Sequence, residues 1–321
     1  MIISKTPLRI SFAGGGSDLP SYYKQNSGQV ISSSINKYVY VIVKKRFDNK
    51  IYVNYSIKEI VDNVDDIKHS LVREALKEVG ISGGIEITTL SDIPSEGSGL
   101  GSSSAITVGL LNAFYNYKNI LISKEDLASK ACNIEINKCK HPIGKQDQYG
   151  CSIGGFNKII FNSDESVFIK KIEFDSNMLE KNLYLCYTGI TRDANKILAQ
   201  QLKNSSDKSA ENKKLILGVD KLENQLIKND IRMTGPFLDS MWKIKKKMAA
   251  GISNSKIESL YKNGIDSGST GGKILGAGGG GFILFYVPRL NQENFENKMG
   301  KYNFLDFKFE SHGTKVIFVE S

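Results

Sequence analysis

One segment of the chain combines glycines and hydroxyl side chains in a pattern that suits phosphate binding. Residues 94–105 have the sequence PSEGSGLGSSSA, and the apolar run 106–111 that follows predicts the start of a buried helix. Glycines let backbone N–H groups approach a small anion, and a helix N-terminus attracts negative charge. The segment therefore predicts a loop that binds nucleotide phosphates. Its candidate contacts are Gly97, Ser98, Gly99, Leu100, Gly101, Ser102, Ser103 and Ser104.

Two better-known phosphate loops do not fit the sequence. A Walker loop requires a lysine after its last glycine, and none follows Gly101. The run GAGGGG at 276–281 matches the dinucleotide fingerprint formally, but a predicted strand follows it where the fingerprint needs a helix. The loop at 94–105 therefore belongs to another class of nucleotide site.

Two acidic residues could carry chemistry beside this loop. Glu135 lies in a helix predicted over 124–138, and Asp147 lies in a glycine-flanked turn at 144–150. Phosphoryl transfer to a hydroxyl needs a carboxylate at a metal ion and a second one near the nucleophile. Taken alone, the two residues also fit an ordinary surface acid and a turn acid.

The N-terminal segment 6–20 has the sequence TPLRISFAGGGSDLP, in which a strand ends in three glycines followed by Ser17 and Asp18. An ionised aspartate can accept hydrogen bonds from two neighbouring sugar hydroxyls. The alternative is a capped turn in which Asp18 binds nearby backbone N–H groups.

Hydrophobic periodicity predicts the elements that must position these residues. We expect strands at 7–13, 38–43, 51–55, 85–89, 158–162, 167–173, 183–187, 281–287 and 314–319. We expect helices at 68–79, 103–117, 124–138, 193–203, 208–228, 236–249 and 291–300. The chain changes from strand-rich to helix-rich near 175–185, which predicts an α+β protein with domains at 1–180 and 181–321.

Composition narrows the class of protein. The 321 residues carry a formal net charge of +9, which favours anionic ligands. The lysines are scattered apart from a short run at 243–247, which we interpret as a solvated helix face. No pattern typical of nucleic-acid-binding modules appears, and no apolar stretch is long enough for a membrane span. Four cysteines without CxxC spacing indicate free thiols in the cytoplasm.

Three motifs together resemble those of the GHMP kinases, the family of galactokinase, homoserine kinase, mevalonate kinase and phosphomevalonate kinase. They are residues 6–20, 94–105 and 276–281, which occur in the family's order and span nearly the whole chain. The second motif has one extra residue before Gly-Leu-Gly. The resemblance implies a ribosomal protein S5 domain 2-like N-terminal domain, a ferredoxin-like C-terminal domain and an active site in the cleft between them.

The first and last motifs are most similar to the heptose branch of the family. Galactokinases carry Gly-Glu-His-Thr-Asp where this chain has Gly15, Gly16, Ser17 and Asp18. The resemblance implies ATP-dependent phosphorylation of the anomeric hydroxyl of D-glycero-D-manno-heptose 7-phosphate to the 1,7-bisphosphate, for nucleotide-activated heptose. A fucokinase-like enzyme acting on an unphosphorylated sugar is the near alternative. A nucleic-acid-binding protein and an ATP sensor without turnover are competitors from other classes.

The resemblance also implies roles for single residues. The 94–105 loop holds the ATP phosphates, and Ser103 and Glu135 bind Mg²⁺. Asp147 is the general base or orienting group for the sugar O1, and Arg9 pairs with it. Candidate sugar contacts are Gly15, Gly16, Ser17, Asp18, Gly278 and Gly279. Arg192 could bind the substrate phosphate or form a surface salt bridge, and the sequence leaves a homodimer open.

Overall fold

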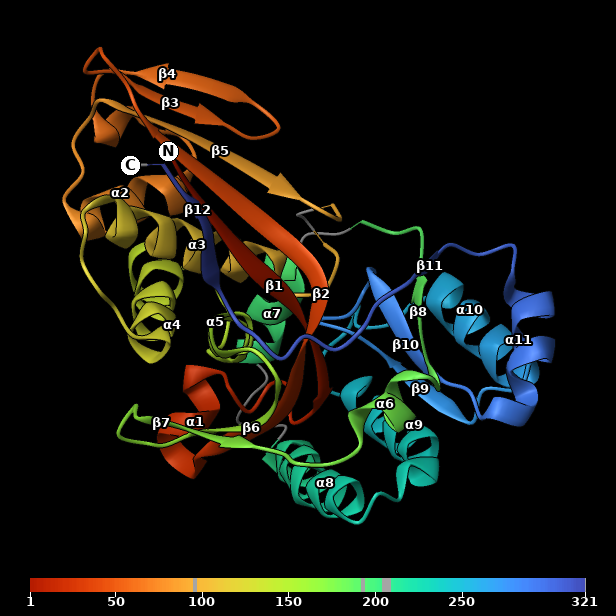
Figure 1. Cartoon of the computed structure of the whole chain (residues 1–321). Helices are drawn as coiled ribbons and strands as arrows, with labels where there is room; N and C mark the ends of the chain where they lie inside the picture. Colours follow the sequence, from red (N-terminus) through yellow and green to blue (C-terminus); the bar gives the residue numbers. More distant parts are fainter. Residues whose placement is uncertain (95–96, 192–193, 204–208, 321) are drawn as a thin grey trace.

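The computed structural model describes residues 1–94, 97–191, 194–203 and 209–320, which form two sheets with helices packed around them (Figure 1). The larger sheet has the order β12 (Lys315–Val319), β1 (Ile2–Ala13), β2 (Gly28–Lys45), β5 (Ile85–Ser91), β3 (Ile51–Asn54) and β4 (Lys58–Val61). Two further strands, β6 (Phe156–Phe161) and β7 (Val167–Lys171), extend it from β2. Among these described pairs, only β3 and β5 are parallel.

The long strand β2 pairs with a different neighbouring strand along each of its two halves. Residues 39–45 pair with β5, whereas 28–33 pair with β6. In the first part Val39, Val41 and Val43 are buried, which is the alternation expected of a strand with one face on the core. The sequence predicted only residues 38–43 because the other half carries Ser32, Ser33 and Ser34, which are buried here.

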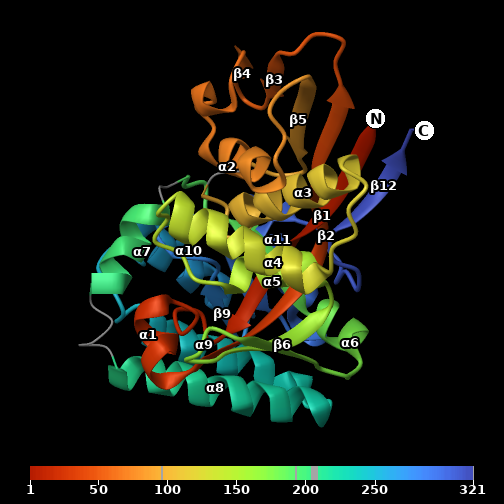
Figure 2. The ribbon, with the colours of Figure 1, turned by 90° about the vertical axis from the view of Figure 1, so that its left-hand side faces the viewer.

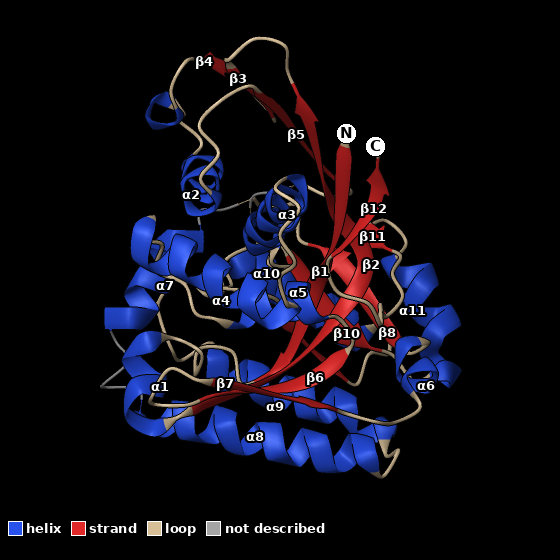
Figure 3. Cartoon of the chain, turned by 60° about the vertical axis from the view of Figure 1, so that its left-hand side comes forward, coloured by secondary structure: helices blue, strands red, loops and turns tan. Residues whose placement is uncertain are grey.

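Helices cover one face of the larger sheet (Figure 3). They are α2 (Ser70–Val79), α3 (Ser102–Tyr117), α4 (Lys124–Cys132) and α5 (Gln146–Ile153). The apolar helix α3 is buried along most of its length and packs on β1 and β2. The predicted phosphate loop leads directly into this helix, so its position is fixed by the core of the sheet.

The smaller sheet is antiparallel and has the order β11 (Phe304–Leu305), β8 (Leu183–Tyr187), β10 (Phe282–Tyr286) and β9 (Gly271–Ile274). Its strands thus lie in the order fourth, first, third, second along the chain, with helices after the first and third strands. This is a β-α-β-β-α-β arrangement of the ferredoxin-like kind. Its helices include α7 (Ala194–Lys203), α8 (Ser209–Ile227), α9 (Thr234–Lys245), α10 (Ser255–Asp266) and α11 (Gln292–Met299). Within the described residues, no helix has the length and apolar character needed to cross a membrane.

The C-terminal strand returns to the larger sheet. Strand β12 pairs with β1, with Val319 opposite Ile2, so the two ends of the chain lie side by side (Figures 1 and 3). The predicted boundary at 180/181 falls between α6 (Ser176–Glu180) and β8. That division stays a prediction, and the last strand packs with the first part of the chain.

Most predicted elements are present, and most of the missed ones are short. The elements not predicted from the sequence are α1 (Pro20–Asn26), α5, α6, α10, β4, β9 and β11. The helix predicted at 124–138 is α4 followed by a π-helical turn, η2 (Asn133–Lys138). Figure 2 shows α1 beside α8 at the edge of the molecule away from β3 and β4.

The third glycine motif forms the loop between β9 and β10 and packs against the predicted phosphate loop. A Cβ added at Gly276 would lie 2.5 Å from the Cα atom of Gly99, and one at Gly281 would lie 2.3 Å from the Ser98 carbonyl oxygen. Real Cβ atoms do not approach other atoms so closely. Glycine at these positions therefore lets the two loops, one from each sheet, touch backbone to backbone.

We expect Gly276→Ala to destabilise the protein more than Gly80→Ala. Both glycines have similar positive φ values, +66° and +68°, but a Cβ at Gly80 would have no atom within 4 Å. The two variants share the backbone strain, and only Gly276→Ala adds a clash, so the difference in the free energy of unfolding should be about 1–3 kcal/mol. Denaturant unfolding measures it. Equal losses would show that the two loops separate without cost.

Candidate active site

A cavity of about 690 Å³ lies where the two sheets meet, and residues from all three glycine motifs line it. The phosphate loop and the N-terminus of α3 form one wall, and Gly15, Gly16 and Asp18 from the first motif form another. Gly276 and Ala277 close it on the side of the smaller sheet. The cavity therefore brings together segments that are far apart in the sequence.

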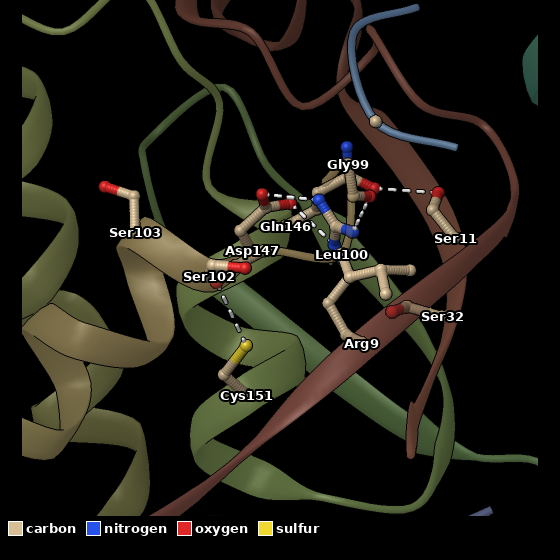
Figure 4. Close-up of polar contacts among 12 residues, drawn as sticks. Arg9, Ser11, Ser32, Gly99, Leu100, Ser102, Ser103, Gln146, Asp147 and Cys151 are labelled. Carbon is tan, nitrogen blue, oxygen red and sulfur yellow. Dashed lines mark hydrogen bonds and ion pairs between the residues drawn. The ribbon is translucent and has the colours of Figure 1, made fainter. Parts of the chain in front are cut away.

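Arg9 connects β1, the phosphate loop and α5 at the floor of the cavity (Figure 4). Its side chain is only 2% exposed on β1. Nε donates to Oδ1 of Asp147 at 2.8 Å and Nη2 donates to Oδ2 at 2.5 Å, a two-point ion pair. Nη1 donates to the carbonyl oxygen of Gly99 at 2.6 Å. One guanidinium thus fixes both the phosphate loop and the predicted catalytic carboxylate.

Asp147 does not lie in a turn, as the sequence analysis had it, but in the first turn of α5. The flanking glycines Gly144 and Gly150 suggested a turn, yet Gly150 lies within the helix and packs against the Arg9 side chain. Negative charge is stabilised at a helix N-terminus. The carboxylate is about a quarter exposed and faces the cavity, where a substrate hydroxyl can reach it.

The predicted phosphate loop has the backbone geometry of an anion site. Gly97, Gly99 and Gly101 have φ values of 71°, 78° and 78°, a left-handed backbone conformation that favours glycine and occurs in anion-binding turns. Gly101 directly precedes α3. Every predicted loop residue lines the cavity except Leu100, which is buried in the core and binds the Arg9 N–H through its carbonyl oxygen at 2.9 Å. Leu100 is thus an anchor of the loop.

Glu135 lies beside Ser103 at the start of α3. Its Oε2 accepts a hydrogen bond from the Ser103 hydroxyl at 3.1 Å, and its Oε1 accepts one from Nε2 of Gln148 at 2.9 Å. Glu135 lies in the π-helical turn η2, a type of irregularity that is frequent at functional sites. Burial raises the pKa of Glu135 to about 7, although hydrogen bonds from Gln148, Ser104 and Ser103 lower it.

These oxygens fit a magnesium ion. Mg²⁺ prefers oxygen ligands and is usually held by one or two carboxylates together with substrate phosphates. The described residues contain no cluster of three or more acidic, histidine or cysteine ligands. A single buried carboxylate and a hydroxyl beside the phosphate loop are what an ion shared with a nucleotide requires.

Asp18 lines the cavity and also binds backbone N–H groups, so both interpretations of this residue retain support. Its Oδ1 accepts from the Gly16 N–H at 2.9 Å, and its Oδ2 accepts from the Gln146 N–H at 3.2 Å at the start of α5. Burial raises the pKa of Asp18.

Ser17 is different: it is fully buried, and its hydroxyl exchanges hydrogen bonds with the backbone of Gln29. Its expected sugar contact has no support in this placement.

Two other predicted substrate contacts, Gly278 and Gly279, are not among the residues that line the cavity. Gly278 and Gly279 pack against Ile252, whose carbonyl oxygen accepts the Gly279 N–H at 2.7 Å. Their neighbours Gly276 and Ala277 line the cavity instead. Arg192 lies outside the described residues.

Several residues that line the cavity were not predicted from the sequence. The cavity is also lined by Gln146, Gln201, His141 and Lys245. A second cavity of about 430 Å³ shares Ser103 and His141 with the first and extends between α2 and β5. Gln146 was adjacent to Asp147 in sequence, whereas no local pattern identified Gln201 on α7 or Lys245 on α9.

Comparisons with known proteins show the family of this chain. The model of the GHMP kinases N terminal domain matches residues 67–155. The chain is 31% identical to the D-glycero-alpha-D-manno-heptose 7-phosphate kinase of Campylobacter jejuni, and the match covers 98% of each protein. This chain belongs to the GHMP kinases. Like other GHMP kinases it is an ATP-dependent kinase, and the predicted α+β, two-domain GHMP fold is confirmed.

Two further proteins are similar to this chain. The chain is 25% identical to the L-fucokinase/L-fucose-1-P guanylyltransferase of Bacteroides fragilis, over 88% of this chain and 34% of that protein. The crystal structure of a D-glycero-D-manno-heptose 1-phosphate kinase from Bacteroides thetaiotaomicron has the same fold, with a TM-score of 0.82, 23% identity and full coverage of both chains.

Glu135 should make the metal-free protein less stable as the pH rises. Its pKa is about 7 when folded and near 4.5 in an unfolded chain, so the folded state binds more protons between these values. The contribution of Glu135 to stability is therefore fully present below pH 4.5 and is lost, by on the order of 3 kcal/mol, as the pH rises to about 7. We expect Glu135→Gln to lose this part of the pH dependence, measured by denaturant unfolding in EDTA between pH 5 and 8.

The matched control is Glu125→Gln, which changes an exposed carboxylate in the first turn of α4. It should keep the pH dependence of the wild-type protein. If Glu135→Gln kept it as well, Glu135 would be ionised throughout this range.

Proposed function

We propose that this GHMP kinase transfers a phosphoryl group from ATP to the anomeric hydroxyl of D-glycero-D-manno-heptose 7-phosphate, giving the 1,7-bisphosphate and ADP. The observation that carries the proposal is the Arg9 contact, which holds Asp147 and the phosphate loop at one cavity. The similarity to a heptose 7-phosphate kinase over 98% of both chains supports the choice of sugar. The product would be an intermediate in the biosynthesis of nucleotide-activated heptose.

The nucleotide phosphates lie against the glycine loop and the N-terminus of α3 in this proposal. The loop supplies backbone N–H groups, and the buried hydroxyls of Ser98 and Ser102 bind one another at 2.9 Å within it. Ser103 and Glu135 would hold Mg²⁺, whose charge offsets that of the phosphates. The second cavity, which shares Ser103 and His141 with the first, has room for the nucleoside.

Asp147 acts on the sugar hydroxyl. The sugar O1 forms a bond to the γ-phosphorus while the bond from that phosphorus to the departing ADP oxygen breaks, and the O1 proton passes to the Asp147 carboxylate. Arg9 holds both carboxylate oxygens, which fixes the direction in which they face the substrate. Phosphoryl transfer has a loose transition state, so positioning and charge neutralisation contribute more than strong basicity.

A fucokinase-like activity on an unphosphorylated sugar is the second candidate, since the chain also matches a fucokinase over 88% of its length. Sugar contacts by Gly15, Gly16 and Asp18 suit either substrate, because all three line the cavity. A cytoplasmic location and a homodimer remain predictions from the sequence.

Release of ADP across a panel of sugars tests the proposed function. We expect turnover in the presence of Mg²⁺ with D-glycero-D-manno-heptose 7-phosphate, and much weaker turnover with the free heptose, L-fucose and galactose. Phosphorus NMR of the product should show a new anomeric phosphate. Turnover on a free hexose alone would overturn the heptose assignment and leave a sugar kinase.

Asp147→Asn should lower kcat by on the order of 10²-fold or more, because the amide cannot accept the O1 proton. The amide oxygen still accepts a hydrogen bond from Arg9, so the loop should keep its position and KM for ATP should change little. Steady-state kinetics on the heptose phosphate measures both constants.

Asp126→Asn is the matched control, because Asp126 binds Ser123 at the exposed start of α4. It should retain wild-type kinetics. A kcat near the wild-type value in Asp147→Asn would remove Asp147 as the proton acceptor.

A further inference from the structure

The lysine run on α9 is not a uniformly solvated face. Lys243 is 69% exposed and pairs with Asp239, and Lys246 pairs with Glu258 at 2.9 Å. Lys245 lies between them but is only 8% exposed and lines the main cavity. The interpretation of the run as solvated is therefore wrong for Lys245.

Lys245 reaches the cavity wall where the two glycine loops touch. Its Nζ donates a hydrogen bond to the carbonyl oxygen of Gly276. Gly276 in turn packs backbone to backbone against Gly99, which accepts a hydrogen bond from Arg9. The ammonium group is thus fixed close to the phosphate loop but comes from the smaller sheet's side of the cavity.

A second buried lysine lies close to Lys245 but is not among the residues that line the cavity. Lys273 on β9 is 4% exposed, and its Nζ donates to the carbonyl oxygens of Ser11 and Phe12 at 2.8 and 3.3 Å. Burial lowers the pKa of Lys273 well below its ordinary value, and the nearby charges of Lys245 and Arg9 lower it further. The three basic side chains therefore lie close enough together for the charges of Lys245 and Arg9 to affect the protonation of Lys273.

The roles of the other two cations are set by protein contacts. Arg9 binds Asp147 and Gly99, and Lys273 binds two backbone carbonyl groups of β1. A buried charge is costly unless an anion or good hydrogen bonds compensate it. Lys245, like Arg9, borders the cavity, but it does so from the side of the smaller sheet, where an anion inside the cavity can reach it.

We propose that Lys245 binds a phosphate group of the ligands in this cavity. The inference rests on the proposed function for the identity of those ligands. An ammonium group can donate up to three hydrogen bonds, so its contact with Gly276 and a contact with phosphate oxygens are compatible. The phosphate can belong to the nucleotide or to the non-reacting end of the sugar phosphate, and binding measurements separate the two sources.

The test compares Lys245→Gln, Lys245→Arg and Lys243→Gln with the wild-type protein. Glutamine keeps a donor for the Gly276 carbonyl group but removes the charge, whereas arginine keeps the charge. Lys243→Gln makes the same change on the exposed side of α9. Isothermal calorimetry gives the Kd for ADP with Mg²⁺, for D-glycero-D-manno-heptose 7-phosphate and for the free heptose. Thermal unfolding without ligand checks that each variant is folded.

We expect Lys245→Gln to weaken binding of one phosphorylated ligand by on the order of 10- to 100-fold, the usual effect of losing a charge-assisted hydrogen bond. Loss for the heptose phosphate but not for free heptose identifies the sugar phosphate as the partner. Loss for ADP identifies the nucleotide. Lys245→Arg should retain most of the affinity, and Lys243→Gln should retain all of it.

The proposal is overturned if Lys245→Gln binds ADP and the heptose phosphate within twofold of the wild-type protein. It is also overturned if free heptose and its phosphate lose affinity equally while ADP binding is unchanged, because the effect would then not involve a phosphate. Failure of the proposed function gives a different result: wild-type protein that does not bind the heptose phosphate. In that case the ADP measurement alone decides the role of Lys245.

Discussion

The structure of the site depends on the ion pair between Arg9 and Asp147, together with the hydrogen bond from Arg9 to Gly99. A buried guanidinium needs full compensation, and it obtains it here only when β1, the phosphate loop and α5 are all in place. The contacts that the buried Arg9 side chain needs therefore fix the relative positions of β1, the phosphate loop and α5. Because Arg9 lies within β1 and pairs with Ser34 of β2, those positions are set by the larger sheet.

The two glycine loops extend this constraint to the smaller sheet. Gly99 and Gly276 touch without side chains between them, so any shift of the β9–β10 loop is transmitted directly to the phosphate loop. Lys273 adds a second connection, from β9 to the carbonyl groups at the end of β1. The phosphate loop and the end of β1 are thus both joined to the smaller sheet by contacts at the cavity.

The sequence allowed good prediction of elements with strong periodicity and of the phosphate loop, because both are determined by neighbouring residues. Prediction failed where contacts between distant segments determine the local structure or the direction of a side chain. The helix containing Asp147 was interpreted as a turn, since the contact of Gly150 with Arg9 is not visible locally. Ser17 and Asp18 are adjacent, yet only Asp18 borders the cavity, because the backbone of Gln29 occupies the Ser17 hydroxyl. The Lys245 side chain likewise points to the cavity because it binds Gly276, which follows β9 of the smaller sheet.

The return of β12 to β1 has a consequence for the order of folding. Strand β1 carries Arg9, and its outer neighbour is formed by residues 315–319. During synthesis from the N-terminus, this edge of β1 stays without its partner until almost the whole chain has emerged from the ribosome. Contacts between such distant segments form slowly, and an unpaired strand edge can associate with other chains in the meantime. The sheet around the strand that carries Arg9 is therefore completed only after residues 315–319 have been made.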